Sequence, residues 1–254
     1  MKLYYEQSGQ GPDVVLLHGW GLHGGVWNQL VSRLAADFRV TVLDLPGHGR
    51  STESAEYSLK DLIELIVPIL NAPAIWIGWS LGALITLSAA QYRIEAVRKM
   101  VLVAATPKFV QSQDWRWAME ASVWQQFMHD FVADYRATLR RFLSLQLGTK
   151  EQSRALLREL RDLLLMHGAP QPGALQAGLN ILCGTDLRAE LPSIQVPVQI
   201  VHGARDKLVP LAAAQYLAAQ LPHARLAVLP AAGHAPFLSH ARDFTEVLLP
   251  FLYG

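Results

Sequence analysis

The chain has 254 residues, of which 51% are hydrophobic and 17% charged, and this balance excludes a disordered protein. Its 22 Lys and Arg residues stand against 21 Asp and Glu residues, so no large net charge draws the chain to nucleic acid. The single cysteine, Cys183, excludes an internal disulfide, and a chain of this length buries a core large enough to fold without one.

The first residues, Met1–Gln7, contain no apolar run of the kind that forms a secretory signal. No later run is apolar and long enough for a transmembrane helix. We therefore expect a cytoplasmic protein that does not enter a membrane, and the single cysteine suits a reducing compartment.

Short apolar runs, each ended by Gly or Pro signals, predict buried parallel strands. They lie at 14–17, 40–43, 74–77, 100–103, 198–201 and 226–229. Helix-length segments separate the first four runs, at about 24–36, 58–70 and 80–92, and a last helix is expected over 240–252. Alternation of strands and helices predicts an α/β fold with a mostly parallel twisted sheet between helices.

Residues 109–185 interrupt this alternation and contain no strand pattern. Breaks at glycine and proline divide them into expected helices at about 112–128, 131–146, 151–166 and 173–183. We predict a core domain of residues 1–108 and 186–254, with 109–185 inserted as a helical lid.

The sequence Gly78-Trp79-Ser80-Leu81-Gly82 has the form G-x-S-x-G between an expected strand and an expected helix. A sharp turn at that place exposes the serine hydroxyl as a nucleophile. An ordinary serine cap of a helix is the alternative explanation.

A nucleophilic serine needs a base, and the base needs an acid to orient it. His234 and Asp206 each follow an expected strand, where the sites of α/β sheets lie, and the order Ser80, Asp206, His234 is that of a hydrolase triad. Asp44 also follows a strand and remains an alternative acid, although Asp44-Leu45-Pro46-Gly47 is typical of a structural turn.

Acyl transfer also needs two N–H donors for the oxyanion. The backbone N–H of Leu81, directly after the nucleophile, is one candidate. Trp20, in His18-Gly19-Trp20-Gly21 after the first expected strand, is the other, and its indole could instead serve only in core packing.

Together these landmarks resemble the α/β-hydrolase superfamily: His18-Gly19, the turn from Asp44 to Ser51, the Ser80 turn, Gly203 to Asp206, and Gly233-His234. The resemblance covers nearly the whole chain outside the helical insertion. It implies hydrolysis of an ester, thioester or lactone through an acyl-serine, with no cofactor and no metal.

Trp20, Trp79 and the segment Phe142-Leu143-Ser144-Leu145-Gln146 are similar to the carboxylesterase family of biotin synthesis, although Ala83 departs from a common second glycine. That family hydrolyses the methyl ester of pimeloyl-acyl carrier protein. The resemblance implies substrate contacts from Trp20, Ser80, Leu81, Phe142, Leu143, Ser144, Leu145, Gln146 and His234.

Seven Lys and Arg residues against two Glu residues lie between positions 136 and 161. Helical spacing gathers them on common faces, which would suit an acidic acyl carrier protein and its phosphate. A solvated face is the alternative. The expected contacts are Arg140, Arg141, Arg154 and Arg158.

Two other functions stay open. The first is a general short-chain esterase, enol-lactonase or carbon–carbon bond hydrolase with the same triad. The second is a ligand receptor that turns over slowly. We expect a monomer, and one short basic stripe is too little to predict nucleic-acid binding.

Overall fold

The computed structural model describes residues 2–52, 56–71, 73–145, 158, 160, 162–163 and 166–254. Its strands are β1 (Tyr4–Ser8), β2 (Asp13–Leu17), β3 (Arg39–Asp44), β4 (Ala74–Trp79), β5 (Val97–Val103), β6 (Val198–Gly203) and β7 (Ala224–Leu229). They form one sheet in the order β1-β3-β2-β4-β5-β6-β7, in which β1 pairs antiparallel with β3 and every other pair is parallel.

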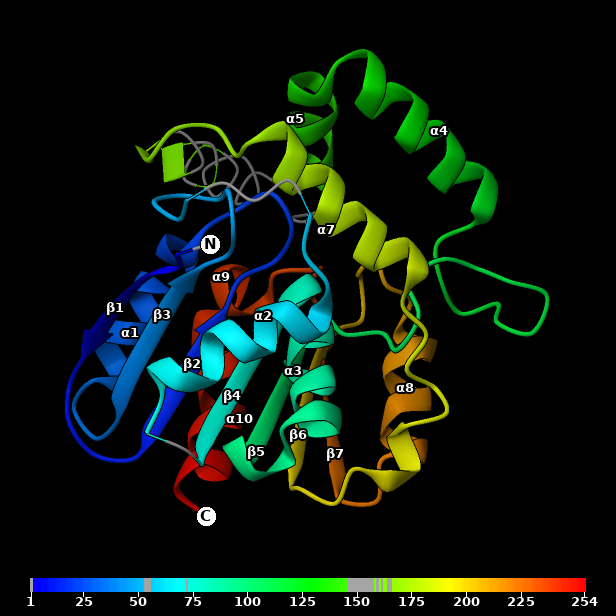
Figure 1. Cartoon of the computed structure of the whole chain (residues 1–254). Coiled ribbons are helices and arrows are strands. Elements are labelled where there is room, and N and C mark those ends of the chain that lie inside the picture. The colour runs from blue at the N-terminus through cyan, green and yellow to red at the C-terminus, as the bar shows by residue number, and fades with distance from the viewer. Residues whose placement is uncertain are drawn as a thin grey trace.

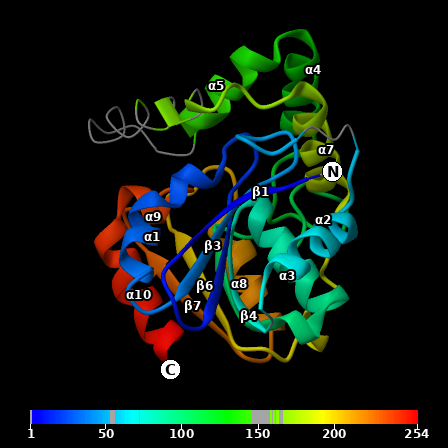
Figure 2. The same cartoon turned by 60° about the vertical axis from the view of Figure 1, so that its left-hand side comes forward.

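Helices cover both faces of this sheet, as Figures 1 and 2 show. One face carries α2 (Leu59–Ile66), α3 (Leu81–Tyr92) and α8 (Leu211–Gln220), and the other carries α1 (Asn28–Leu34), α9 (Pro236–Ser239) and α10 (Ala241–Tyr253). The α/β prediction is therefore confirmed, with a mostly parallel sheet between two layers of helices.

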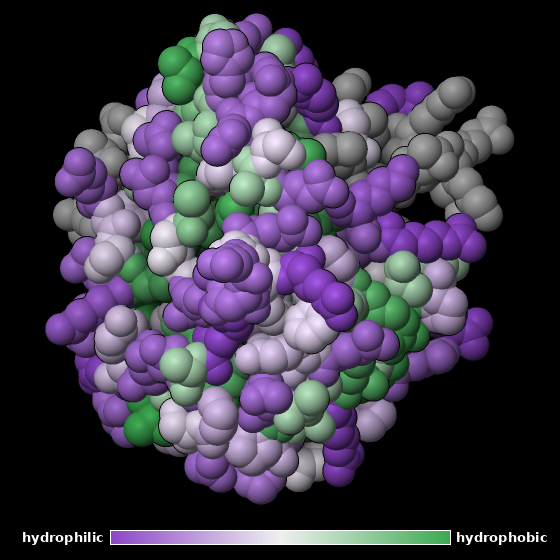
Figure 3. Space-filling model, turned by 90° about the vertical axis from the view of Figure 1, so that its right-hand side faces the viewer, coloured by the Kyte–Doolittle hydropathy of each residue, from purple (hydrophilic) through white to green (hydrophobic). Residues whose placement is uncertain are grey.

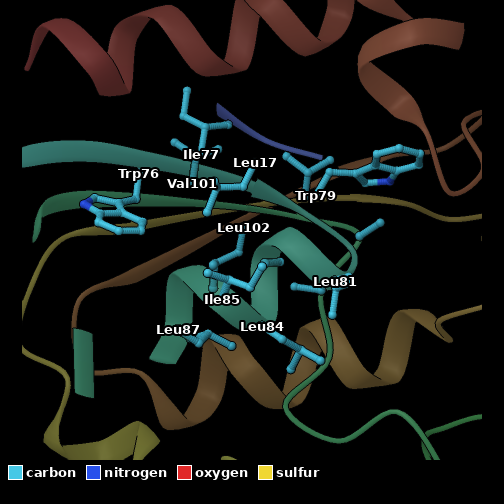
Figure 4. Packing of buried hydrophobic residues seen from close by; sticks show 14 of the residues in the cluster. Leu17, Trp76, Ile77, Trp79, Leu81, Leu84, Ile85, Leu87, Val101 and Leu102 are labelled. Atoms are coloured by element: carbon cyan, nitrogen blue, oxygen red, sulfur yellow. The ribbon is translucent and has the colours of Figure 1, made fainter. Parts of the chain in front are cut away.

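The central strands are apolar because both of their faces are covered. Every residue of β2, β4 and β6 is buried, and so are ten of the twelve residues of α3. Figure 4 shows side chains of β4 and β5 packed against α3. A helix buried all round lacks a polar stripe, and α3 consequently begins with an almost unbroken apolar run.

Three further helices lie between β5 and β6 in the chain: α4 (Ala121–Ala133), α5 (Tyr135–Leu145) and α7 (Pro172–Gly184). They stand above the edge where the parallel strands have their carboxyl ends (Figure 1). The predicted helix over 173–183 is thus confirmed, whereas most of the helix expected at 151–166 lies outside the described residues.

The helix predicted over 112–128 is wrong in its first half, because α4 begins only at Ala121. Before it the chain folds back on itself, with the N–H of Met119 donating to the Phe109 carbonyl at 3.0 Å. The Trp115 indole donates to the Lys108 carbonyl at 3.0 Å and its ring packs on Tyr216 of α8. Burial of this tryptophan against a distant helix outweighs the local helical pattern.

The helix predicted over 131–146 instead begins at Tyr135, because Asp134 ends α4 and accepts the N–H of Ala137 at 2.9 Å. Two other predicted helices are α-helical only in part. Residues Gly24–Trp27 of the helix predicted over 24–36, and Val67–Ile69 of the helix predicted over 58–70, form short 3-10 helices. The structure also adds β1, α8 and α9, which the sequence pattern did not predict.

Hydrophobic residues on the face shown in Figure 3 lie in separate groups among hydrophilic ones. Within the described part of the chain, no helix is both long and apolar enough to cross a membrane.

Candidate active site

Ser80 lies in the turn that joins β4 to α3, and its backbone adopts φ 56° and ψ −113°. A positive φ is strained for a residue with a side chain, so the surrounding structure must hold it there. Its N–H donates to the Val103 carbonyl of β5 at 3.0 Å, and its carbonyl accepts the N–H groups of Ala83 and Leu84. The predicted strand-to-helix turn is therefore present.

The two glycines of the G-x-S-x-G turn are required by backbone packing. A Cβ on Gly78 would lie 2.2 Å from the Gly82 carbonyl oxygen, and a Cβ on Gly82 would lie 2.3 Å from the Leu17 carbonyl oxygen. Both distances are shorter than any real contact of this kind. The glycines let α3 start directly against β2 and β4, which sharpens the turn that carries Ser80.

The structure brings His234 and Asp206 together, with 2.7 Å between His234 Nδ1 and Asp206 Oδ2. His234 follows β7 and Asp206 follows β6, and these strands are neighbours in the sheet. Their loops touch because Gly203 has no side chain: a Cβ there would lie 2.2 Å from the Gly233 carbonyl oxygen. Sequence position after two strands was enough to predict this pair.

Asp206 is a buried carboxylate with three hydrogen bonds. Its Oδ1 accepts the N–H groups of Leu208 at 2.8 Å and Val209 at 3.0 Å, which leaves Oδ2 for His234. Burial favours the neutral acid, but the charge and hydrogen bond of His234 and the backbone donors outweigh it and lower the pKa of Asp206. The group is therefore ionised at neutral pH.

With Nδ1 hydrogen-bonded to a carboxylate, the imidazole of His234 carries its proton there and presents Nε2 as an acceptor. That atom is buried and has no hydrogen-bond partner among the described residues. A free base of this kind, oriented by an acid, is the arrangement that takes a proton from a nucleophile.

His202 of β6 lies beside this pair, with its Nε2 3.6 Å from Asp206 Oδ2. Burial lowers the pKa of His202, so its ring is neutral, and its Nε2 donates to the Val209 carbonyl at 3.0 Å. This hydrogen bond joins β6 to Val209 and so holds together the loop that carries Asp206.

Asp44, the alternative acid, forms its hydrogen bonds and ion pair with other residues and not with His234. Its carboxylate accepts the N–H of Gly24 at 2.8 Å and the N–H of Arg50 at 2.9 Å, and the Arg50 side chain pairs with it as well. These bonds fold the turn after β3 and support the interpretation of Asp44 as a structural residue.

The candidate oxyanion loop after β2 passes close to the nucleophile. A Cβ on Gly19 would lie 3.3 Å from the Ser80 Cβ. The backbone N–H of Trp20, the next residue, donates to no acceptor in the described part of the chain. Leu81 begins α3 and is fully buried beside it. The first N–H groups of a helix have no acceptor within that helix, so the Leu81 N–H, like that of Trp20, is available to bind an oxyanion.

Two buried histidines form hydrogen bonds to the backbone of the candidate oxyanion loop, a role that the sequence did not indicate. His18 donates from Nδ1 to the Gly19 carbonyl at 2.8 Å and accepts the Leu45 N–H at 2.9 Å. His48 accepts the Gly21 N–H through Nε2 at 3.4 Å. Both rings must be neutral to accept, and burial lowers the pKa of each, that of His48 to about 4.

The Trp20 side chain faces the helices above the sheet. Its indole donates to the Leu175 carbonyl of α7 at 2.8 Å, and its ring meets Phe142 of α5 edge-on with 5.0 Å between centroids. Phe127 and Phe131 of α4 complete the group. This aromatic cluster joins the candidate oxyanion loop to α4, α5 and α7.

The other predicted substrate contacts of α5 differ in exposure. Leu143 is fully buried, whereas Ser144 is exposed and donates to the Arg140 carbonyl of its own helix at 3.0 Å. The side chain of Leu145 and all of Gln146 lie outside the described residues.

Of the predicted arginine contacts, Arg140 and Arg158 are exposed. Arg141 pairs with Asp130 of α4 at 2.6 Å, and Arg154 lies outside the described residues.

Comparison with known proteins agrees with this geometry. Residues 14–247 match the Alpha/beta hydrolase family, and the chain therefore belongs to that family. Among solved structures, an esterase from Exiguobacterium antarcticum superposes with a TM-score of 0.91 at 25% identity, covering 99% of this chain and 96% of that one.

Curated relatives are similar over nearly their whole length. A pimeloyl-[acyl-carrier protein] methyl ester esterase from Nitrosomonas europaea is 44% identical over 245 residues, which is 96% of this chain and 97% of the relative. A protein of the same name from Xanthomonas oryzae pv. oryzae is 42% identical over 98% of both chains.

Proposed function

We propose that the chain is a serine carboxylesterase that hydrolyses the methyl ester of pimeloyl-acyl carrier protein through an acyl-serine intermediate. The observation that carries the chemistry is the buried His234–Asp206 pair. Among the described residues, His234 Nε2 has no hydrogen-bond partner, and Ser80 stands in a strained turn directly after β4. Sequence identity of 44%, over 96% of the chain, to a protein named for that esterase activity supports the substrate.

In the first half of the reaction, His234 Nε2 accepts the Ser80 proton while the serine oxygen forms a bond to the ester carbonyl carbon. The carbonyl oxygen becomes an oxyanion, and the backbone N–H groups of Trp20 and Leu81 bind it. His234 then gives its proton to the leaving methoxide, and methanol departs.

In the second half, water attacks the acyl-serine and His234 accepts its proton. Collapse of the second tetrahedral intermediate breaks the bond to Ser80, which regains the proton from His234, and the free acid leaves. Throughout, the Asp206 carboxylate holds the proton on Nδ1 and stabilises the imidazolium.

We further propose that residues 109–185 form a lid over the site, with residues 1–108 and 186–254 as the core. Support comes from the position of α4, α5 and α7 above the carboxyl ends of the strands (Figure 1). The edge-on contact of Phe142 of α5 with Trp20 supports this proposal, because Trp20 belongs to the proposed oxyanion loop. An apolar wall of this kind suits the methylene chain of a pimeloyl group.

An acyl carrier protein is the proposed partner, and the exposed Arg140 and Arg158 of the lid would meet its acidic surface. We keep a monomeric, cytoplasmic enzyme as part of the proposal. Light scattering on a sizing column tests the first, and cell fractionation tests the second.

The test is methanol release from pimeloyl-acyl carrier protein methyl ester by the purified protein. We expect release that is lost in Ser80→Ala and that exceeds release from the free monomethyl ester. Turnover retained by Ser80→Ala would overturn the mechanism. Equal rates on the carrier-bound and free esters would overturn the carrier-directed function and favour a general esterase.

Charge at the lid is tested with Arg140→Glu, and Arg33→Glu is the matched control because Arg33 is also an exposed arginine, on α1 of the core. We expect Arg140→Glu to raise KM for the carrier-bound ester and leave the free ester unchanged, while Arg33→Glu alters neither.

A further inference from the structure

Trp79, the residue before the nucleophile, is the last residue of β4 and is fully buried. The G-x-S-x-G pattern leaves its position variable, so the pattern assigns this side chain no role. Trp76 lies three residues earlier and is equally buried. Side chains alternate along a strand, and the two indoles consequently project to opposite faces of the sheet, as Figure 4 shows.

The Trp79 indole reaches the loop that carries the proposed base. Its Nε1–H donates to the His234 carbonyl oxygen at 2.8 Å, and the two rings lie 5.8 Å apart between centroids. Phe237, the second residue of α9, meets the Trp79 ring edge-on at 5.1 Å and stacks on Trp27 at 4.2 Å. The indole thus lies between the nucleophile strand and the histidine loop.

This hydrogen bond is the main anchor of the His234 backbone. Within the described residues, no backbone N–H donates to the His234 carbonyl, and the His234 N–H makes no backbone hydrogen bond. Asp206 orients the imidazole through Nδ1, but this side-chain bond does not fix the position of the His234 carbonyl. Two anchors, one on the ring and one on the backbone, define where Nε2 lies.

The same ring also supports the proposed oxyanion loop. A Cβ on Gly19 would lie 3.1 Å from Trp79 Cε3 and 3.3 Å from Cζ3, so the Gly19 backbone lies directly on the indole. One rigid side chain, attached next to Ser80, therefore touches the loops that carry the base and the candidate oxyanion donor.

We propose that Trp79 is a positioning residue, whose indole sets His234 and the oxyanion loop at their working distance from Ser80. The inference rests on the proposed function, because it takes His234 as the base. Loss of the N–H donor lets the His234 backbone move, and a misplacement of about 1 Å in a reacting group can cost about 100-fold in rate.

Trp79→Phe removes the donor and keeps an aromatic ring. Trp76→Phe is the matched control, because its indole is also fully buried and donates to a backbone carbonyl, that of Ala96, at 3.0 Å. The two variants lose the same kind of group from the same strand, so a general effect of weakened packing is expected in both.

The assay is acylation by p-nitrophenyl acetate, with active sites counted by complete labelling with a fluorophosphonate and Ser80→Ala as the blank. We expect Trp79→Phe to lower the acylation rate constant per active site by about 10- to 100-fold, with KM changed less than about threefold. Trp76→Phe should keep both within about twofold. A structural role alone would reduce the number of active sites and leave the rate per site unchanged.

A measurement on the unaltered enzyme covers the case in which Trp79→Phe does not fold. When a fluorophosphonate phosphonylates Ser80, fluoride leaves and the serine proton passes to His234. The indole ¹H–¹⁵N signal of Trp79 should then shift while that of Trp76 stays in place. A Trp79 signal that does not respond, or equal acylation rates in the two variants, would overturn the positioning role and leave the proposed function intact. Turnover by Ser80→Ala would instead refute the proposed function itself.

Discussion

Replacing Asp206 by asparagine should nearly abolish activity while leaving the fold in place. The structure dictates how the new amide would lie. The N–H groups of Leu208 and Val209 both point at Oδ1, at 2.8 and 3.0 Å, so the amide oxygen must take that position. The amide nitrogen then faces His234 Nδ1, where the carboxylate oxygen stood at 2.7 Å.

An NH₂ group at that place can only donate, and His234 Nδ1 must become the acceptor. The ring proton moves to Nε2, which can no longer accept the proton of Ser80. Loss of the correct tautomer costs about 10⁴ in kcat in a comparable triad, which corresponds to about 5 kcal/mol of transition-state stabilisation. Three hydrogen bonds survive in number, so the free energy of unfolding should change by only about 1–2 kcal/mol.

The assay is kcat/KM on a small activated ester at neutral pH, together with urea unfolding. Asp44→Asn is the control, since Asp44 is the other buried aspartate after a strand and accepts backbone N–H groups of Gly24 and Arg50. It should lower stability and leave kcat/KM within about tenfold. If Asp206→Asn keeps kcat/KM within about tenfold while Asp44→Asn loses it, the assignment of the acid is wrong.

Three further predictions each concern one residue and its surroundings. Burial lowers the pKa of His48 from 6.5 to about 4, so between these values the unfolded chain binds a proton that the folded chain does not. The free energy of unfolding should therefore fall by up to about 3 kcal/mol as the pH drops through that window, and His48→Gln should flatten the slope in urea titrations; an unchanged slope refutes this. Gly82→Ala places a Cβ 2.3 Å from a backbone oxygen of β2 and should cost about 1–3 kcal/mol and most activity, whereas Gly184→Ala, with no heavy atom within 4 Å, should stay within about 1 kcal/mol. Similar melting temperatures for the two glycine variants would contradict the packing argument. Arg188, 19% exposed, pairs with two carboxylates, and Arg188→Met should lower the free energy of unfolding by about 1–3 kcal/mol; Arg141→Met, at a side chain 60% exposed, should change it by less than about 0.5 kcal/mol. Equal denaturation midpoints for the arginine variants would count against that difference.

Local pattern in the sequence was sufficient for the centre of the sheet. Strands such as β2 and β4 are buried on both faces, so their residues form continuous apolar runs that end in glycine or a polar loop. The sequence pattern did not predict the edge strand β1, because this strand is not buried on both faces. Four of its five residues are exposed, and its sequence, YYEQS, contains no apolar run. Propensity alone does not separate such a strand from a loop.

The positions of Ser80, Asp206 and His234 were also predictable, because each follows a strand and parallel strands bring their carboxyl ends to one edge. What the sequence could not supply was distance. The 2.7 Å between His234 and Asp206 depends on β6 and β7 being neighbours and on Gly203 letting the two loops touch.

Tertiary structure alone decided the residues that hold this site in place. The sequence did not indicate the contacts of Trp79 and His48, whose hydrogen bonds join segments 155 and 27 positions apart. The helix predicted from residue 112 likewise gave way to a loop whose Trp115 packs on α8. Contacts between distant segments carry no periodic signal in the chain, because they depend on how whole elements pack and not on the neighbours of each residue.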